Sequence, residues 1–189
     1  MSLLDELDEL RRVLDDCRAT LPAEVERASS LLRSALSRPG AKVLVCGNGG
    51  SAASAQHFAA ELVGRYRVDR PPIAAVALTA DAVTLTAVAN DSDFSRVFAR
   101  QVEALARPGD ALVALSTSGR SPNVVAAAAA ARALGCAVVA LTGRAEGAPL
   151  AAHADAVISV PSAVVARIQE VHALALHCLA GALEEAAGA

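Results

Sequence analysis

KVLVCGNGGSAASAQHFAAELVGRY, residues 42–66, joins an apolar run to a glycine-rich turn and then to a helix-forming segment. The run at 42–46 is short and apolar after Lys42, which is typical of a buried strand. The turn Gly47–Ser51 lies where the helix-forming segment begins. Free backbone N–H groups and the positive end of the helix dipole at such a turn suit a phosphate or another anion. The order strand, turn, helix therefore predicts an α/β unit that binds an anion.

His57 and Glu61 follow on the same predicted helix, one turn apart. A histidine and a carboxylate at this spacing share a helix face, where they can hold a metal ion or transfer a proton. An isolated pair of this kind is more often a solvated surface feature. This pair follows an anion-binding turn directly, which favours a functional role. A phosphate-binding turn beside acid–base groups points to a phosphorylated small molecule.

Outside this stretch, strand-like and helix-like segments alternate. Strands are expected at 42–46, 73–78, 111–115, 136–141 and 155–160. Helices are expected at 51–65, 81–89, 93–106, 121–134 and 163–186. Several of the strands are continuous apolar runs, as in a parallel sheet covered on both faces. The pattern predicts an α/β fold, a three-layer sandwich around a central five-stranded parallel sheet.

Residues 3–37 precede the sheet and are predicted to be helical, with Pro22 placed to break or kink the helix. We expect 1–40 to form an N-terminal helical segment that packs on the same domain and provides an oligomer interface. The remaining residues, 41–189, would form the domain that carries the site.

Composition excludes several classes of protein. Hydrophobic residues make up 54% of the 189 residues and aromatic residues only 2%, so we expect an aliphatic core. The net charge of -3 and the absence of a basic block argue against nucleic acid as the ligand. No apolar run reaches the roughly 20 residues that span a bilayer, and the acidic N-terminus does not resemble a secretory signal. We expect a soluble, cytoplasmic protein with four buried, unpaired cysteines.

A second candidate anion site is the turn Ser116–Ser121, which contains four hydroxyl side chains and leads into a predicted helix. Ser121 suits the N-cap of that helix, and Pro122 suits its first position. The same residues would also suit an ordinary capped turn. Two such turns at the carboxyl edge of one parallel sheet, where ligands bind, favour a phosphate site.

The last predicted helix, 163–186, is apolar nearly all round and should be buried. It contains Gln169, His172 and His177, and buried polar side chains must find partners. A core histidine bonded to a backbone carbonyl is as good an interpretation of His172 as a functional one. For His177 a functional role is favoured.

Asn90 and Asp91 end a helix-like segment near the same edge of the sheet. Taken alone, they are more typical of a helix cap or a turn than of a binding site.

Together these segments resemble the sugar isomerase (SIS) domain family, and within it the phosphoheptose isomerases. Four stretches carry the resemblance, in order: CGNGGSAASAQHFAAELVGRY, AVANDSDFSRVFARQVEAL, LSTSGRSPNVV and RIQEVHALALH. It covers about residues 10–185 and implies a flavodoxin-like SIS fold. It also implies an aldose–ketose isomerase of heptose biosynthesis, which converts sedoheptulose 7-phosphate to D-glycero-D-manno-heptose 7-phosphate via an enediol. A cytoplasmic homotetramer with active sites at subunit interfaces is implied as well.

The resemblance further implies roles for single positions. Glu61 and His177 match the family's acid–base residues. The family's zinc ligands, one Zn²⁺ per subunit, match His57, Glu61, Gln169 and His177. Its substrate-binding positions match Asn48, Gly49, Gly50, Glu61, Asn90, Asp91, Ser116, Thr117, Ser118, Ser121 and Gln169.

The spacing of two of these ligands is awkward. Gln169 and His177 lie eight residues apart on one helix, which separates their Cα atoms by about 12 Å along its axis. A neighbouring subunit could supply one of the two. His172 is the second-choice ligand, because it is better spaced from Gln169.

Two other functions stay open at this point. Some relatives of the family have lost the histidine and the glutamate and act as non-catalytic partners of the replication initiator DnaA. Because this chain keeps His57 and Glu61, the enzyme is favoured. The third possibility is an isomerase of another phosphosugar, since the turns specify phosphate and hydroxyls more clearly than chain length.

Overall fold

A central parallel sheet organises the computed structural model, which describes residues 2–188. Its five strands have the order β2-β1-β3-β4-β5, which is the flavodoxin-like order. They are β1 Val43–Gly47, β2 Ala75–Ala77, β3 Ala111–Ser116, β4 Ala137–Thr142 and β5 Ala156–Ser159. All neighbouring strands pair in parallel. The predicted five-stranded parallel sheet is confirmed, although β2 is shorter than the expected strand at 73–78.

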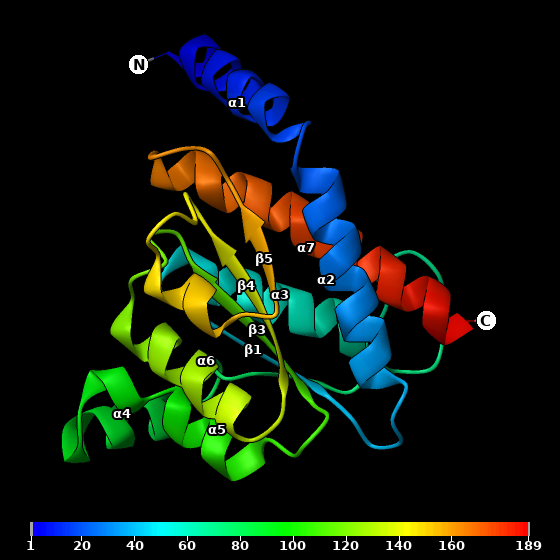
Figure 1. The fold of residues 1–189 in the computed structure, drawn as a ribbon, viewed down its shortest axis with the longest axis vertical. Coiled ribbons are helices and arrows are strands. Elements are labelled where there is room, and N and C mark those ends of the chain that lie inside the picture. The colour runs from blue at the N-terminus through cyan, green and yellow to red at the C-terminus, as the bar shows by residue number, and fades with distance from the viewer. Residues whose placement is uncertain (1, 189) are drawn as a thin grey trace.

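Helices cover both faces of the sheet (Figure 1). They are α1 Leu3–Cys17, α2 Leu21–Leu36, α3 Gly50–Val63, α4 Ala82–Asp91, α5 Ala99–Leu105, α6 Pro122–Ala133 and α7 Val165–Gly188. Successive residues of β1 point to opposite faces: Val43 and Val45 join the core beneath α2, α3 and α7, whereas Leu44 and Cys46 join the core beneath α5 and α6. The predicted three-layer sandwich is therefore confirmed.

The segment 93–106 departs from the expectation of one helix. It forms a short 3₁₀ turn, Phe94–Arg96, followed by α5. The Asp93 carboxylate accepts a hydrogen bond from the backbone N–H of Ser95 at 2.7 Å, which caps the 3₁₀ turn. Local capping thus divides the segment, a feature that helical periodicity does not reveal.

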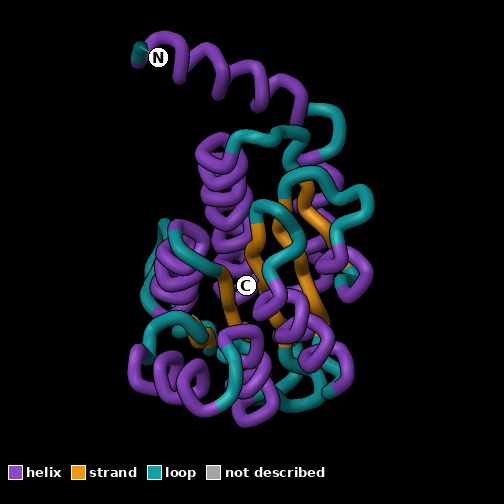
Figure 2. The backbone as a smooth tube through the Cα atoms, turned by 90° about the vertical axis from the view of Figure 1, so that its left-hand side faces the viewer, coloured by secondary structure: helices purple, strands orange, loops and turns teal. Residues whose placement is uncertain are grey.

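The N-terminal segment forms two helices, with Pro22 in the first turn of α2. Figure 2 shows α1 projecting from the rest of the molecule. Its Leu3 and Leu4 side chains are 75% and 72% exposed. The buried guanidinium of Arg167 on α7 holds α1 through an ion pair of 2.9 Å with Glu6. The division into 1–40 and 41–189 stays a prediction.

The cysteines follow the expectation in three of four cases. Cys17, Cys46 and Cys136 are buried, but Cys178 is exposed on α7, so its predicted burial is wrong. The residues around Cys178 are apolar in sequence, but its own position lies on the outer face of the helix. Complete burial raises the pKa of the Cys46 thiol to about 12, so this thiol beside the glycine turn stays protonated.

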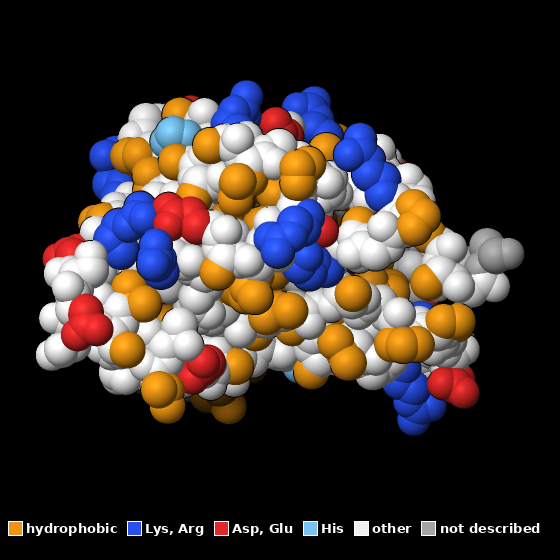
Figure 3. Space-filling view, turned by 90° about the horizontal axis from the view of Figure 1, so that it is seen from below, with side chains coloured by type: hydrophobic (Ala, Val, Ile, Leu, Met, Phe, Trp, Pro, Cys, Tyr) orange, Lys and Arg blue, Asp and Glu red, His pale blue; other side chains and the backbone are white. Residues whose placement is uncertain are grey.

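Within residues 2–188, none of the helices combines the length and the apolar character needed to cross a bilayer. The lower face of the molecule carries basic side chains interspersed with acidic and apolar ones (Figure 3).

Candidate functional site

The glycine turn after β1 forms the N-terminus of α3, as predicted. Gly49 is the N-cap and has a φ of 55°, a left-handed conformation that favours glycine. Gly50 follows with the amide of Gln169 directly above it: a Cβ at Gly50 would lie 2.7 Å from Gln169 Nε2. The turn is therefore shaped both by its own backbone and by the close approach of α7.

The serine turn, Ser116–Ser121, forms the junction of β3 and α6. Ser116 Oγ donates to Ser121 Oγ at 3.0 Å, and Ser118 Oγ accepts from the backbone N–H of Arg120 at 3.2 Å. Ser121 is the N-cap of α6 and Pro122 its first residue, as predicted. The Ser121 hydroxyl makes no capping hydrogen bond. The hydroxyls are thus arranged within the turn, in front of the α6 dipole.

An amide pair joins the two turns. The side chains of Asn48 and Asn123 exchange two hydrogen bonds of 2.8 Å. The turn that follows β4 is linked to the serine turn as well, because the N–H of Gly143 donates to the Thr117 carbonyl at 3.0 Å. The carboxyl ends of β1, β3 and β4 therefore carry one connected set of turns, and the Asn48 amide is already engaged within it.

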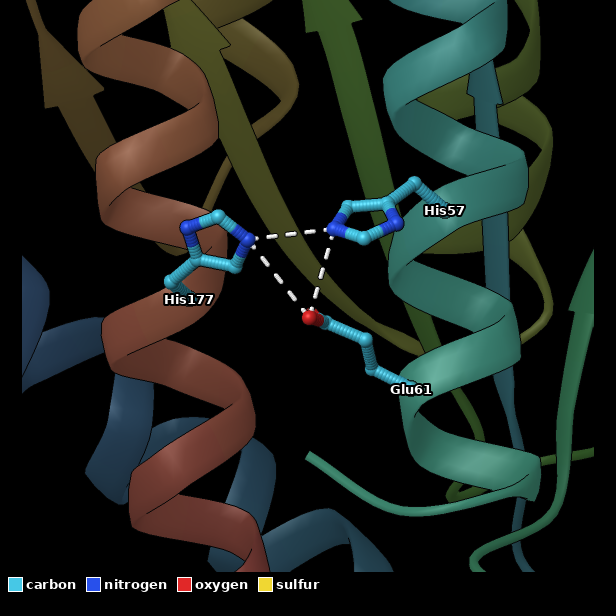
Figure 4. Close-up of side chains that lie close together, drawn as sticks. All are labelled: His57, Glu61 and His177. Carbon is cyan, nitrogen blue, oxygen red and sulfur yellow. Dashed lines mark hydrogen bonds and ion pairs between the residues drawn. The ribbon is translucent and has the colours of Figure 1, made fainter. Parts of the chain in front are cut away.

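Helices α3 and α7 bring three ionisable side chains together, the cluster His57–Glu61–His177 (Figure 4). The two Nε2 atoms of the histidines lie 3.0 Å apart. Glu61 Oε1 lies 3.2 Å from the Nε2 of His57 and 3.5 Å from that of His177. The Glu61 side chain is 11% exposed and that of His177 is 38% exposed, so the cluster meets solvent on the histidine side.

The cluster fits a metal ion. Tetrahedral zinc binds nitrogen and oxygen at about 2.0–2.2 Å, which places its ligand atoms roughly 3.3 Å apart. The three distances in the cluster, 3.0, 3.2 and 3.5 Å, fall around this value. Two imidazoles and one carboxylate are a common donor set for catalytic zinc, with a position left for water or substrate. Glu61 Oε2 is buried and has no hydrogen-bond partner. A buried polar atom normally has a partner, and a bound metal ion would provide one for this carboxylate.

Comparison with known proteins gives consistent results. The SIS domain family matches residues 7–143. A phosphoheptose isomerase of Aromatoleum aromaticum is 49% identical over 182 residues, which are 95% of this chain and 91% of the relative. One of Azoarcus sp. is 48% identical over 190 residues, 96% of each chain.

The chain belongs to the phosphoheptose isomerases of the SIS domain family.

Solved structures of this family agree. The phosphoheptose isomerase of Neisseria gonorrhoeae superposes with a TM-score of 0.90 at 42% identity, over 97% of both chains. That of Francisella tularensis gives a TM-score of 0.90 at 39% identity, over 98% of this chain and 100% of that one. The fold of a phosphoheptose isomerase therefore extends through α7, beyond the end of the SIS domain match at residue 143.

The structure also clarifies the ligand spacing on α7. His177 reaches His57 and Glu61 within the same chain. Gln169 lies instead against Gly50, and about 10 Å of the α3 axis separates Gly50 from His57. The role of Gln169 as a ligand stays a prediction.

His172 is a core histidine, one of the two interpretations considered for it. Its side chain is buried, and its Nε2 donates to the Thr142 carbonyl at 3.1 Å. Burial lowers the pKa of His172 to about 4, so the ring is neutral at physiological pH. Its Nε2 is thus engaged by the sheet, which leaves the second-choice ligand without support.

Asn90 and Asp91 lie at the end of α4, where both are exposed. Asn90 Nδ2 donates to Asp91 Oδ1 at 2.8 Å. Among the described residues this is the only side-chain hydrogen bond of either, so within one chain the pair does not join the connected turns. Their substrate-binding role stays a prediction.

Sequence reasoning missed Arg70. Its buried guanidinium donates to the carbonyls of Glu61 and Leu62, both at 2.7 Å. It thereby satisfies the Glu61 carbonyl, adds a second donor to the Leu62 carbonyl, which also accepts from the Ile73 N–H, and places positive charge at the negative end of the helix dipole. The backbone of Glu61 is thus held in place by a residue nine positions later. An arginine after a helix end was the available signal.

Proposed function

We propose that this protein converts sedoheptulose 7-phosphate to D-glycero-D-manno-heptose 7-phosphate. The single observation that carries the proposal is the His57–Glu61–His177 cluster, whose donor atoms lie within 4.8 Å of one another. The relatives named above are phosphoheptose isomerases, at 48–49% identity over nearly the whole chain. The same comparisons do not favour the alternatives of a DnaA-binding regulator or an isomerase of another phosphosugar.

The two turns would bind the phosphate and the sugar hydroxyls. The N-termini of α3 and α6 present backbone N–H groups and positive dipole ends, which suit a phosphate without a lysine. The proposed contacts come from Asn48, Gly49, Gly50, Ser116, Thr117, Ser118 and Ser121, with Gln169 above Gly50. The substrate would then extend from the serine turn toward the cluster between α3 and α7.

The isomerisation requires a proton to move between C1 and C2, and protons to move on O1 and O2. We assign the carbon-bound proton to Glu61, because a carboxylate close to the substrate can remove it and return it on the same face. His177 would exchange protons with O1 and O2 or assist ring opening. A histidine suits this task when no metal ion is bound to its Nε2, because a free imidazole exchanges protons readily. When the ion is bound, His177 would act as its ligand.

The cluster would hold Zn²⁺ through His57, Glu61 and His177, with Gln169 as the further expected ligand. When bound, the ion supplies Lewis-acid polarisation of the substrate oxygens. The two oxygens of Glu61 have different surroundings. Oε1 faces both imidazoles, whereas Oε2 is buried without a hydrogen-bond partner.

A homotetramer with sites at subunit interfaces is part of the proposal. The exposed leucines of the projecting α1 helix give it an apolar face for a neighbouring subunit. Asn90 and Asp91, exposed at the end of α4, could then contact the substrate of another subunit. The cytoplasmic location expected from the sequence stays a prediction.

The test is to incubate the purified protein with sedoheptulose 7-phosphate, with and without a strong zinc chelator, and to follow aldoheptose phosphate by chromatography. We expect product without the chelator and its loss with it, restored by added Zn²⁺. Product formed equally under both conditions would remove zinc from the proposal. No product under either condition would favour the DnaA-binding regulator. Faster turnover of a phosphosugar of another chain length would favour an isomerase of that sugar.

A further inference from the structure

The imidazole of His177 is stacked on the ring of Tyr66. The ring centroids lie 5.6 Å apart and the planes are inclined by 14°, within the range of favourable offset stacking. His57 meets the same imidazole edge-on, at 5.3 Å and 87°. His177 is partly exposed, so without the tyrosine its ring would have freedom to rotate about the Cβ–Cγ bond. Tyr66 therefore covers a face of a cluster residue that the polar contacts leave uncovered.

Tyr66 is itself held by the helix that carries His177. Three consecutive backbone N–H groups, those of Tyr66, Arg67 and Val68, donate to the Glu184 carboxylate at 2.9, 2.9 and 3.0 Å. The Glu184 side chain is 4% exposed. Burial by itself raises the pKa of Glu184, but the three N–H donors and nearby Arg70 outweigh it and lower the pKa below its usual value. The carboxylate is thus a charged anchor for the loop.

The spacing on α7 explains how one helix can both carry His177 and anchor the loop of Tyr66 through Glu184. His177 and Glu184 are seven residues apart, which is close to two turns and places them on the same face. Gly181 lies between them, and a Cβ there would be 3.5 Å from Tyr66 Cε1. The tyrosine ring therefore lies against α7 between the imidazole and the anchor.

Arg67 contacts both the ring and the hydroxyl of Tyr66. Its Cζ lies 4.8 Å from the ring centroid, and its Nη2 donates to the Tyr66 hydroxyl at 3.2 Å. A guanidinium at this distance from an aromatic face is a stabilising cation–π contact.

We propose that Tyr66 is a positioning residue for His177, held in place by Glu184. It keeps the imidazole in the orientation in which Nε2 meets Glu61 and His57. The consequence for turnover rests on the proposed function, whereas the consequences for zinc affinity and for the tyrosine environment do not. Support from outside the ligand shell of a metal typically changes affinity or activity by about 10–100-fold.

The kinetic and zinc tests compare Tyr66→Leu, which removes the aromatic face, with Tyr66→Phe, which keeps it. We expect Tyr66→Leu to lower kcat by about 10-fold or more with KM within about two-fold. Zinc affinity, measured by competition with a chromophoric chelator, should fall by a similar factor. Tyr66→Phe should restore both quantities to within about three-fold, which a merely destabilised protein would not do. Wild-type kcat and zinc affinity in Tyr66→Leu would overturn the proposal.

A spectroscopic test leaves Tyr66 unchanged and so does not depend on the folding of its variants. The chain contains one tyrosine and no tryptophan, so its intrinsic near-ultraviolet emission reports on Tyr66 alone. We expect His177→Ala to change this emission and the matched control His153→Ala, in the remote 3₁₀ turn Pro149–His153, to leave it unchanged. Equal emission from wild type and His177→Ala would contradict the stack. Should the wild type lack isomerase activity, the zinc and emission results would still decide the proposal.

Discussion

The serine turn and the His57–Glu61–His177 cluster are built in opposite ways. The turn consists of consecutive residues between β3 and α6, and Ser116 reaches Ser121 across only five positions. In the cluster, His57 meets His177 across 120 positions, and only the packing of α3 beside α7 brings them together. The difference teaches that the proposed phosphate site depends mainly on local chain geometry, whereas the proposed acid–base site depends on tertiary packing. Perturbations should therefore affect the two regions separately.

Helix α7 is the element that both regions share. His172 bonds to the Thr142 carbonyl at the end of β4, beside the serine turn, and His177 lies in the cluster five residues later. A change in α7 should consequently reach both regions.

The largest expected effect separates chemistry from binding. Glu61→Gln keeps the size of the side chain but removes the basic carboxylate, so kcat should fall by about 10³-fold while KM stays near the wild-type value. Steady-state kinetics with sedoheptulose 7-phosphate measure both. The control is Glu103→Gln, a surface change on α5. Retained turnover would exclude Glu61 as the base.

A second test addresses the helix that joins the regions. The pKa of His172 is about 4 in the folded protein against an ordinary 6.5, so below pH 6.5 the unfolded chain binds a proton that the native state does not. Stability should therefore fall as the pH drops from about 6.5 toward 4, by up to about 3 kcal/mol, and be insensitive to this group above that range.

Urea unfolding at a series of pH values measures this slope. His172→Leu should flatten it, at a cost of about 0.5–1.5 kcal/mol at neutral pH for the one lost hydrogen bond, because the Thr142 carbonyl still accepts from the Val160 N–H. An unchanged slope in the variant would show that other groups cause it.

A third prediction concerns the connection between the two turns. Asn123→Ala removes one half of the amide pair and leaves the Asn48 amide unpaired, so the free energy of unfolding should fall by about 1–3 kcal/mol. Asn48→Ala should have a similar effect. The double variant should cost less than the sum of the two single changes, because neither then leaves an unpaired partner. Additive losses would mean that the pair does not couple the turns.

The smallest effect is expected in the serine turn itself. Ser118→Ala removes one exposed hydroxyl while the backbone N–H groups of the turn stay in place, so KM should rise by about 10-fold or less with kcat nearly unchanged. A matched change outside the site, Ser30→Ala on α2, serves as the control. A collapse of kcat with unchanged KM would break the separation between the two regions.

Much of the fold could be predicted because its signals are local. The apolar runs of β1, β3 and β4, the glycines before α3 and the Ser121-Pro122 start of α6 each specify their own element. The prediction was wrong where local capping competes with periodicity, as at Asp93, and where the facing of a helix decides exposure, as at Cys178. For the candidate site, residue types pointed to His57, Glu61 and His177, but their mutual distances could not be derived from spacing.

The sequence by itself determined the order of strands and helices, the two dipole-backed turns and the residue types available for acid–base chemistry. These follow from interactions between near neighbours in the chain, which backbone geometry and side-chain size set directly. Only the tertiary structure decided that His177 meets His57 in the same chain, that Gln169 lies over Gly50, and that Glu184 and Arg70 hold Tyr66 and Glu61. Those contacts join residues far apart in the chain, and their geometry depends on how α3, α7 and the sheet pack into one core.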